Sequence, residues 1–418
     1  MSGTRQHPAS AGTVGRGYVV VFPSLHRDPL VRHLPPADER PVAGVECEYR
    51  LVDDSGRPAD ARVHLGPRLA DLPHLDPGDP RAVRLDIGSA LTCDGWEAEA
   101  VTPPLPWGPT TGSDLTECVA ATRAALLRIL APDSFAVQGF STHLNVTVPD
   151  RRAVAVARDI ARRCSVAVAL LTEGRSGDGL LVRPRRGRLE VGCDHLEDRM
   201  ITPATTLLAG VVALLQHRPS RLPRLDVAVQ PAREKFGFYV GLDAAGGDLL
   251  RSGRGTVLRT RRGARLSAQD HLEQVWSAAR PYAEAHGLAL AETDAVVSGS
   301  TPLASESGAP PTWTTSGTAV SASTRRWGVD LDPRVRPAGS AGVAWATWDT
   351  TAWRCASDAG TARFAVVPRS RHAGFVAELD AGRLDALLFS EGPSTPPREA
   401  PPARRTAAPR RGPRWVAS

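Results

Sequence analysis

Four segments of the chain alternate hydrophobic and polar residues, the pattern of β-strands with one packed face and one polar face. They read GVECEYRLV, WEAEAV, FSTHLNVTV and GRLEVGCD, and they cover Gly44–Val52, Trp96–Val101, Phe140–Val148 and Gly187–Asp194. The wider segment Arg81–Pro106 reads as two strands joined by a short loop, and Tyr18–Phe22 reads as a further strand. We therefore expect a sheet built from strands that are far apart in the sequence.

Apolar residues at helical spacing predict helices between these strands. The helices are Gly112–Leu130, Asp150 to about Leu171, Thr202–His217 and Arg265–Leu288, the last being one helix or a pair. The expected N-caps are Ser113, Asp150, Thr202 and Ser267, and Pro203 falls in a first turn. The third of these helices is apolar enough to lie buried.

Changes in local amino-acid composition divide the chain into four parts. Residues 1–16 and the Pro/Ala/Arg-rich tail 391–418 are expected to be disordered, because neither can bury a core. Residues 17–290 hold the predicted strands and helices and form one large domain. Residues 291–390, rich in Gly, Ser, Pro and Thr, are expected to form a small β-rich domain. Its tryptophans, which either form a core or bind a ligand, are Trp313, Trp327, Trp345, Trp348 and Trp353.

Composition excludes several classes of protein. The formal net charge is +6, but the tail alone carries six arginines against two glutamates, so the body is near neutral and no nucleic acid is expected. No apolar run approaches the roughly 20 residues of a membrane helix, and Tyr18–Phe22 is too short for a secretory signal. The six cysteines show no metal-binding or disulfide spacing, which fits a reducing cytoplasm.

The polar faces of the four alternating strands carry an unusual set of side chains. They are Glu46 and Glu48, Glu97 and Glu99, His143 and Asn145, and Arg188 and Glu190. An ordinary solvated face alternates in the same way, but it carries mixed charges. Acidic side chains on neighbouring strands repel one another unless a cation lies among them. Oxygen ligands of this kind favour Mg²⁺, commonly together with phosphates.

Two residue types occur only once, and each marks a position of interest. Asn145 is the sole asparagine and Lys235 the sole lysine, against a background rich in Ala, Arg, Gly and Pro. Lys235 follows no glycine-rich loop, which excludes a Walker-type phosphate site. It is either a phosphate contact or an exposed residue.

The order of motifs between Gly44 and Leu288 resembles that of the glutamine synthetase-like carboxylate–amine ligases. GVECEYR resembles the opening strand of the glutamate–cysteine ligase type 2 family. LDIGS followed by EAVTP, and then STHLNVTV, RLEVGCD with its following helix, and GARLSAQDHLEQVW, resemble the Pup ligase and depupylase family. Glu190 stands where the Pup branch usually has His, and the loop from Asp86 to Glu99 is longer. Beyond Leu288 nothing resembles the Pup ligases.

This resemblance implies a fold and a set of roles. The fold is α+β, with a curved antiparallel sheet and helices on its outer face. Glu46, Glu48, Glu99 and Glu190 would hold Mg²⁺, with Glu190 alternatively a substrate contact. His143, Asn145 and Arg188 would contact ATP. Asp86, in the Asp-x-Gly-Ser motif, would accept a proton from the attacking amine.

The activity implied is ATP-dependent formation of an amide or isopeptide bond through an acyl phosphate. The substrates would be a carboxylate donor and an amine acceptor, either a small molecule or a protein lysine, and a protein partner is left open. Two alternatives remain at this point. One is an amide hydrolase of the depupylase type on the same fold, and the other is a catalytically degenerate binding module.

Overall fold

The computed structural model describes residues 40–389 with internal gaps. The gaps are residues 71, 73–74, 77–78, 134, 175–178, 219–220, 233–234, 242–248, 307–309, 315–324, 330–332 and 359–361. The segment 1–16, the predicted strand Tyr18–Phe22 and the tail 391–418 lie outside the described residues.

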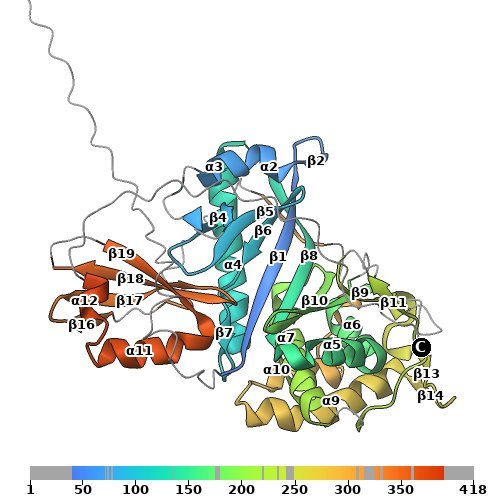
Figure 1. Cartoon of the computed structure of the whole chain (residues 1–418). Coiled ribbons are helices and arrows are strands. Elements are labelled where there is room, and N and C mark those ends of the chain that lie inside the picture. The colour runs from blue at the N-terminus through green and yellow to red at the C-terminus, as the bar shows by residue number, and fades with distance from the viewer. Residues whose placement is uncertain are drawn as a thin grey trace, which may run out of the picture.

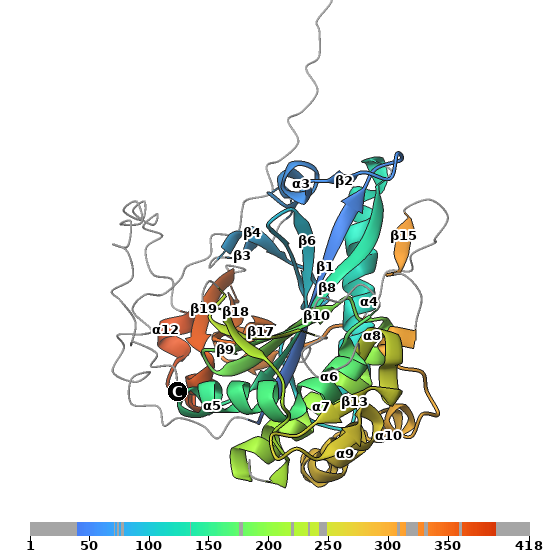
Figure 2. The ribbon, with the colours of Figure 1, turned by 90° about the vertical axis from the view of Figure 1, so that its right-hand side faces the viewer.

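One large sheet twists through the middle of the molecule (Figures 1 and 2). In spatial order its strands are β11 (Val229–Ala232), β12 (Gly237–Gly241), β9 (Gly179–Arg185), β10 (Arg188–Asp194), β8 (Ala136–Thr147), β1 (Val42–Val52), β6 (Glu97–Val101), β5 (Ala90–Asp94), β4 (Asp79–Arg84) and β3 (Leu75–Asp76). Three short strands pair outside this path: β15 (Thr312–Thr314) with β8, and β2 (Pro58–Ala59) and β7 (Leu105–Pro106) with β1. All of these pairings are antiparallel, as predicted.

Helices cover the apolar face of this sheet. Val45, Cys47 and Tyr49 of β1 are no more than 1% exposed and belong to the main hydrophobic core. The helices on this face are α4 (Thr111–Leu130), α5 (Asp150–Asp159), α6 (Ser165–Thr172) and α7 (Asp198–His217), and α9 (Ala268–Ala285) packs outside them against α6 and α7. Shorter elements are α2 (Ala61–His64), α3 (Gly66–Ala70), α8 (Leu249–Ser252), β13 (Val257–Arg259), β14 (Arg265–Ser267) and α10 (Ala291–Val297). The predicted α+β class, an antiparallel sheet with helices packed on it, is confirmed.

Helix starts differ from the prediction in instructive ways. Ser267 caps α9 in a capping box with Asp270, as expected. Helix α4 begins after Thr110, and Ser113 lies inside its first turn. Helix α7 begins at Asp198, so Thr202 and Pro203 lie within it. The prediction placed the start at the proline, but burial of Met200 and Ile201 in the core extends the helix upstream.

The helix predicted from Asp150 is divided. A π-helical turn, Ile160–Cys164, separates α5 from α6. Asp150 is the first helical residue rather than the cap, and its Oδ1 accepts a hydrogen bond of 2.6 Å from the Gly187 N–H in the β9–β10 turn.

The segment Arg81–Pro106 holds more strands than the two predicted. Strands β4, β5 and β6 form consecutive hairpins, with β7 beyond them. The turn between β5 and β6 consists of Gly95 and Trp96, and Gly95 has a positive φ of 57°. A two-residue turn of this kind agrees with the short loop expected in this segment, and the further strand β4 accounts for the residues before Asp86.

The C-terminal region forms a second sheet with its own core, beside the first (Figure 1). Its elements are β16 (Arg334–Arg336), β17 (Gly339–Ala346), β18 (Thr350–Ser357), β19 (Ala362–Pro368), α11 (His372–Asp380) and α12 (Asp385–Phe389). Trp353 and Phe375 are fully buried in this core. Residues 291–314 pack differently, since α10 contacts α7 and β15 pairs with β8 of the large sheet.

The tryptophans that cluster in the sequence separate in space. Trp327 belongs to the main core. Trp313 packs edge-on against Tyr49, with ring centroids 5.9 Å apart. Trp345 packs on Phe364 at 5.1 Å. Most of these indoles are therefore core residues, and the exception is Trp348, described below.

Helix α7 is the one described helix that is long and apolar enough to cross a membrane. Of its most apolar window, 89% is buried inside the protein, where it packs against α4 and α9. It therefore serves as the central core helix, in agreement with the prediction that this segment lies buried.

Stability should fall in mild acid because of His271 on α9. Its side chain is fully buried, and this burial lowers its pKa to about 4. The unfolded chain takes up the proton near pH 6.5, so stability is present above that pH and is lost as the pH falls towards 4. We expect the free energy of unfolding to drop by about 2 kcal/mol between pH 7 and pH 5 from this residue.

Urea unfolding at the two pH values measures the drop. His271→Leu is the matched variant, because it removes the titrating group and keeps an apolar side chain in the core. The acid-dependent loss should be smaller in this variant than in the wild type by the stated amount. Equal losses in the two proteins would contradict the assignment.

Candidate active site

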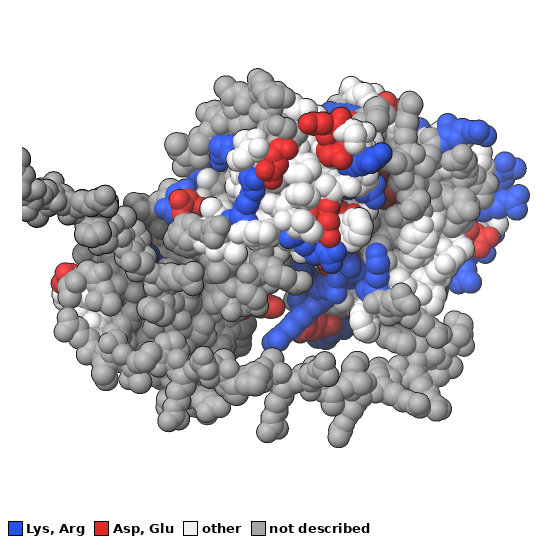
Figure 3. Space-filling model, turned by 90° about the horizontal axis from the view of Figure 1, so that it is seen from above, with Lys and Arg blue, Asp and Glu red and all other residues white. Residues whose placement is uncertain are grey.

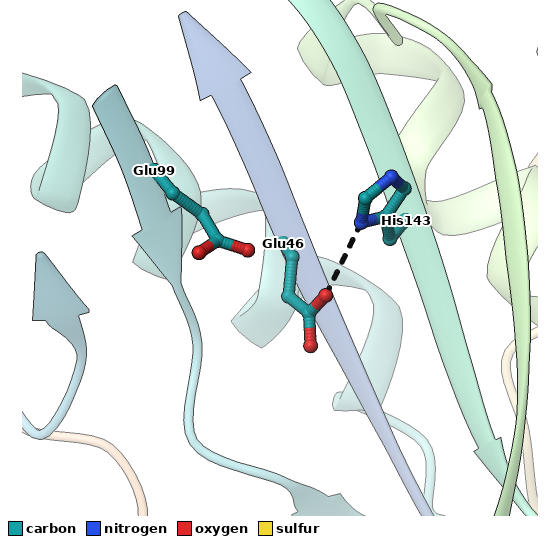
Figure 4. Close-up of side chains that lie close together, drawn as sticks. All are labelled: Glu46, Glu99 and His143. Atoms are coloured by element: carbon teal, nitrogen blue, oxygen red, sulfur yellow. Dashed lines mark hydrogen bonds and ion pairs between the residues drawn. The ribbon is translucent and has the colours of Figure 1, made fainter. Parts of the chain in front are cut away.

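The register of three central strands gathers acidic side chains on the face opposite the helices. On β1, Glu46 pairs with His143 of β8, and Glu48 pairs with Ser141 of β8 on one side and Glu99 of β6 on the other. Residues two apart share a face, so these side chains all project together. Figure 4 shows Glu99, Glu46 and His143 side by side on their three strands.

Glu46, Glu99 and His143 can each bring a ligand atom within 4.8 Å of the others. The His143 Nδ1 lies 3.3 Å from Glu46 Oε2, and its Nε2 lies 3.8 Å from Glu48 Oε1. Ser141 Oγ donates a hydrogen bond of 2.5 Å to Glu48 Oε2, which fixes the fourth side chain beside the other three. We call Glu46, Glu99 and His143 the acidic cluster.

The electrostatics of the acidic cluster reflect crowded carboxylates. Burial, with the charges of Glu46 and Glu48, raises the pKa of Glu99 to about 8. Burial would raise the pKa of Glu46, but its hydrogen bond to His143 and nearby positive charges lower it. Burial would lower the pKa of His143, but Glu46 and Glu48 outweigh it and raise that pKa. Such a group favours a bound cation, which relieves the repulsion between carboxylates.

A β-bulge and a glycine lie directly beside the acidic cluster. The β1–β8 register shifts between Glu48 and Tyr49, where Phe140 is the extra residue on β8. Bulges of this kind often re-aim side chains next to active sites. On β10, Gly192 faces His143, and a Cβ at that position would lie 3.2 Å from the imidazole Cδ2. The glycine therefore makes room for the ring.

Arginines from β9 and β10 border the acidic cluster. Arg188 donates from Nε to Asn145 Oδ1 at 2.8 Å, and Asn145 is 1% exposed. Glu190, 2% exposed, forms ion pairs with Arg183 and with Arg185, the latter at 2.8 Å between Nε and Oε2. Both carboxylate oxygens of Glu190 thus face guanidinium groups. The structure does not bring Glu190 into the acidic cluster.

A pocket of about 880 Å³ opens beside the acidic cluster. Its polar lining residues include Glu48, Asp94, Ser141, His143, Glu173, Arg183, Asp194, Lys235 and Tyr239. On the face seen in Figure 3, acidic and basic side chains of the described residues intermix instead of forming a patch of one sign. A pocket with both signs suits a ligand that carries phosphates together with metal ions.

Some of these residues escaped the sequence analysis. Arg183 lies on β9, a strand that was not predicted, although the alternation in GLLVRPR is typical of a strand. Asp94 was not among the predicted site residues, and it lines the pocket because the tight β5–β6 turn places it there.

The structure places Asp86 apart from the acidic cluster. It is exposed, in the turn between β4 and β5, and it is not among the residues that line the pocket. Its backbone carbonyl accepts a hydrogen bond of 2.7 Å from Arg326 Nε. Its role as a proton acceptor therefore remains a prediction from the motif.

The known proteins that resemble this chain are solved structures with low sequence identity to it. No family model and no curated protein matches the sequence. The crystal structure of the complex between the prokaryotic ubiquitin-like protein Pup and its ligase PafA is similar at a TM-score of 0.43 and 13% identity, over 62% of this chain and 62% of that chain. The Pup ligase PafA in complex with ADP is similar at 0.37 and 12%, over 57% and 61%.

This chain spans less than two thirds of the length of either solved structure. Both structures are Pup ligases, the family that the sequence motifs resemble. A likeness of this degree assigns neither an activity nor a ligand to this chain.

Proposed function

We propose that this protein is an ATP-dependent carboxylate–amine ligase, and that the acidic cluster holds Mg²⁺ beside the phosphates of ATP. The observation that carries this proposal is the convergence of Glu46, Glu99 and His143, from three separate strands, to within 4.8 Å. The donor set fits a divalent cation, because carboxylate oxygens are the ligands that Mg²⁺ prefers and because burial and like charge disfavour leaving the carboxylates together uncompensated. The motif order along the chain supports the same reading.

Each part of the site has a separate task in this reaction. Mg²⁺, when bound, neutralises charge on the phosphates during phosphoryl transfer. Arg188 and Arg183 place positive charge beside the acidic cluster, where it suits phosphate oxygens. The pocket admits the substrate carboxylate, which takes the γ-phosphoryl group to give an acyl phosphate and ADP. The amine then attacks the acyl carbon, and inorganic phosphate leaves.

The amine must lose a proton before it attacks, since an ammonium ion has no free lone pair. Asp86 is proposed for this task because of its match to the Asp-x-Gly-Ser motif. Asp94, on the neighbouring hairpin, is the second candidate because its side chain lines the pocket. Asp86→Asn and Asp94→Asn separate the two, since only loss of the true base should lower turnover steeply at neutral pH.

The acyl donor is unidentified, so the test uses a general trap for acyl phosphates. The protein is incubated with ATP, Mg²⁺, hydroxylamine and pools of amino acids, dicarboxylates or peptides with free carboxyl ends. A ligase should release ADP and form a hydroxamate in equal amounts, and only with the correct carboxylate. Cleavage of an amide substrate without ADP release would overturn the ligase in favour of the amide hydrolase. Failure to bind nucleotide with Mg²⁺ at all would favour the binding module.

Glu190→Gln is expected to leave Mn²⁺ affinity unchanged, measured on the protein alone by calorimetry. The reason is that its oxygens contact Arg183 and Arg185 and not the acidic cluster. The same variant should lower the free energy of unfolding by about 3 kcal/mol, because it breaks a buried ion pair. A loss of metal affinity with little loss of stability would instead make Glu190 a metal ligand, as the family resemblance implies.

A further inference from the structure

A turn of the small C-terminal sheet lies beside the candidate active site. The turn Thr347–Thr350 joins β17 and β18 and is held rigidly, since the Thr347 N–H donates to the Thr350 carbonyl at 2.7 Å and the two hydroxyl oxygens lie 2.9 Å apart. The Asp349 carbonyl accepts a hydrogen bond of 2.8 Å from Arg369 N–H, which ties the turn to the end of β19. Trp348 lies in this turn.

Trp348 packs against the large sheet instead of its own. At Gly44 of β1, two residues from Glu46, an added Cβ would lie 3.4 Å from the indole Cζ2 and 3.7 Å from Nε1. The guanidinium carbon of Arg188 lies 5.4 Å from the centre of the indole ring, within the range of a cation–π interaction. The indole therefore contacts the strand that carries Glu46 and the arginine beside it.

Arg188 differs from Arg183 and Arg185 in the groups that contact its guanidinium. Arg183 and Arg185 share the Glu190 carboxylate, which compensates one of their two positive charges. Arg188 is held by the neutral Asn145 amide and by the indole of Trp348. Within the described part of the chain, no carboxylate lies within ion-pair distance of Arg188, and the charges of Glu46 and Asp349 act on it only from farther away. Its position is thus fixed while its charge stays available to an anion.

We propose that Trp348 is a positioning residue, through which the small C-terminal sheet holds Arg188 at the edge of the acidic cluster for a phosphate group of the nucleotide. This inference rests on the proposed function, because it takes the anion to be part of ATP. It gives the C-terminal sheet a task in the site: the sheet completes the anion-binding edge that β1, β8 and β10 begin. The side-chain amide oxygen of Asn145 and the indole ring of Trp348 are then the two groups that hold the Arg188 guanidinium in place.

A double-mutant cycle tests the proposal on the full chain, with MgADP as the probe. Trp348→Ala should weaken MgADP binding about 5–10-fold, the worth of a partly desolvated cation–π contact. Trp348→Phe keeps an aromatic face and should restore most of the affinity. Arg188→Met should weaken binding at least as much, and the double variant should be no weaker than Arg188→Met. In turnover with ATP, Trp348→Ala should raise KM with little change in kcat.

Two results would overturn the proposal. One is unchanged MgADP affinity in Trp348→Ala, and the other is full additivity of the two losses in the double variant. Urea unfolding of the same four proteins is the second measurement, and Trp348 and Arg188 should be coupled in it as well. If the wild-type chain bound no MgADP, the proposed function would fail, while the absence of coupling in unfolding would show separately that Trp348 does not hold Arg188.

Discussion

Glu46→Gln is expected to lower both Mn²⁺ or Mg²⁺ affinity and ATP turnover by on the order of 100-fold or more. The substitution keeps the shape of the side chain and removes one charge from the centre of the acidic cluster. Glu46 lies between Glu99 and His143 and hydrogen-bonds the latter at 3.3 Å, so removing its charge also weakens its interaction with the imidazole. Glu99→Gln should act in the same direction. Calorimetry with Mn²⁺ and steady-state ADP release measure the two effects.

Glu97→Gln is the matched control for this prediction. Glu97 lies on the same strand and the same face as Glu99, two residues away, but it faces Arg50 at 3.8 Å and lies outside the acidic cluster. The same chemical change there should leave metal affinity and turnover near the wild-type values. If Glu46→Gln and Glu99→Gln bound the metal as well as Glu97→Gln does, the acidic cluster would not be the metal site.

The sequence predicted the acidic cluster and the neighbouring Glu48 because these residues lie on strands whose alternation is unambiguous. Glu46, Glu48, Glu99 and His143 all fall on the polar face of a strand, and the apolar positions between them fix that face towards solvent or a pocket. Repulsion between carboxylates was the signal that these strands share a cation. Local pattern and simple electrostatics were therefore sufficient for these four residues.

Partners across the sheet could not be predicted in the same way. Glu190 shares the polar face of β10, and strand β9, which was not assigned, pairs beside it and delivers Arg183 and Arg185 to its carboxylate. Alternation within β10 alone does not show which side chains of its neighbour reach Glu190. The same holds for Trp348, since nothing in its neighbourhood along the chain indicates that it lies against Gly44.

The Asp-x-Gly-Ser motif illustrates a different limit. Sequence analysis assigned chemistry to Asp86, while the structure gives the clearest roles to the other two motif residues. Ser89 is fully buried, and its Oγ accepts a hydrogen bond of 2.7 Å from Thr122 Oγ1 of α4. Gly88 lies against Trp327, whose backbone N–H donates to the Ile87 carbonyl at 2.8 Å. Residues of a motif shared with a family can therefore serve to pack a turn against the rest of the protein as well as to catalyse a reaction.

Gly88→Ala is expected to destabilise the protein by about 4 kcal/mol. Gly88 has a φ of 95°, which a residue with a Cβ adopts only with strain, roughly 1–2 kcal/mol. A Cβ there would also lie 1.8 Å from the Trp327 carbonyl oxygen, so the backbone of one segment must move, at a further cost of about 1–3 kcal/mol. Chemical unfolding followed by circular dichroism measures the loss.

Gly95→Ala separates the two causes of that loss. Gly95 also has a positive φ, 57°, but a Cβ at that turn would meet only the Glu97 carboxylate oxygen at 3.4 Å, the end of a flexible side chain. It should therefore cost only the conformational part, about 1 kcal/mol. Equal losses of unfolding free energy in the two variants would mean that the close contact between Gly88 and the Trp327 carbonyl does not contribute to the effect. A loss of turnover in the folded fraction of Gly88→Ala, beyond its loss of stability, would mean that catalysis depends on the turn that carries Asp86.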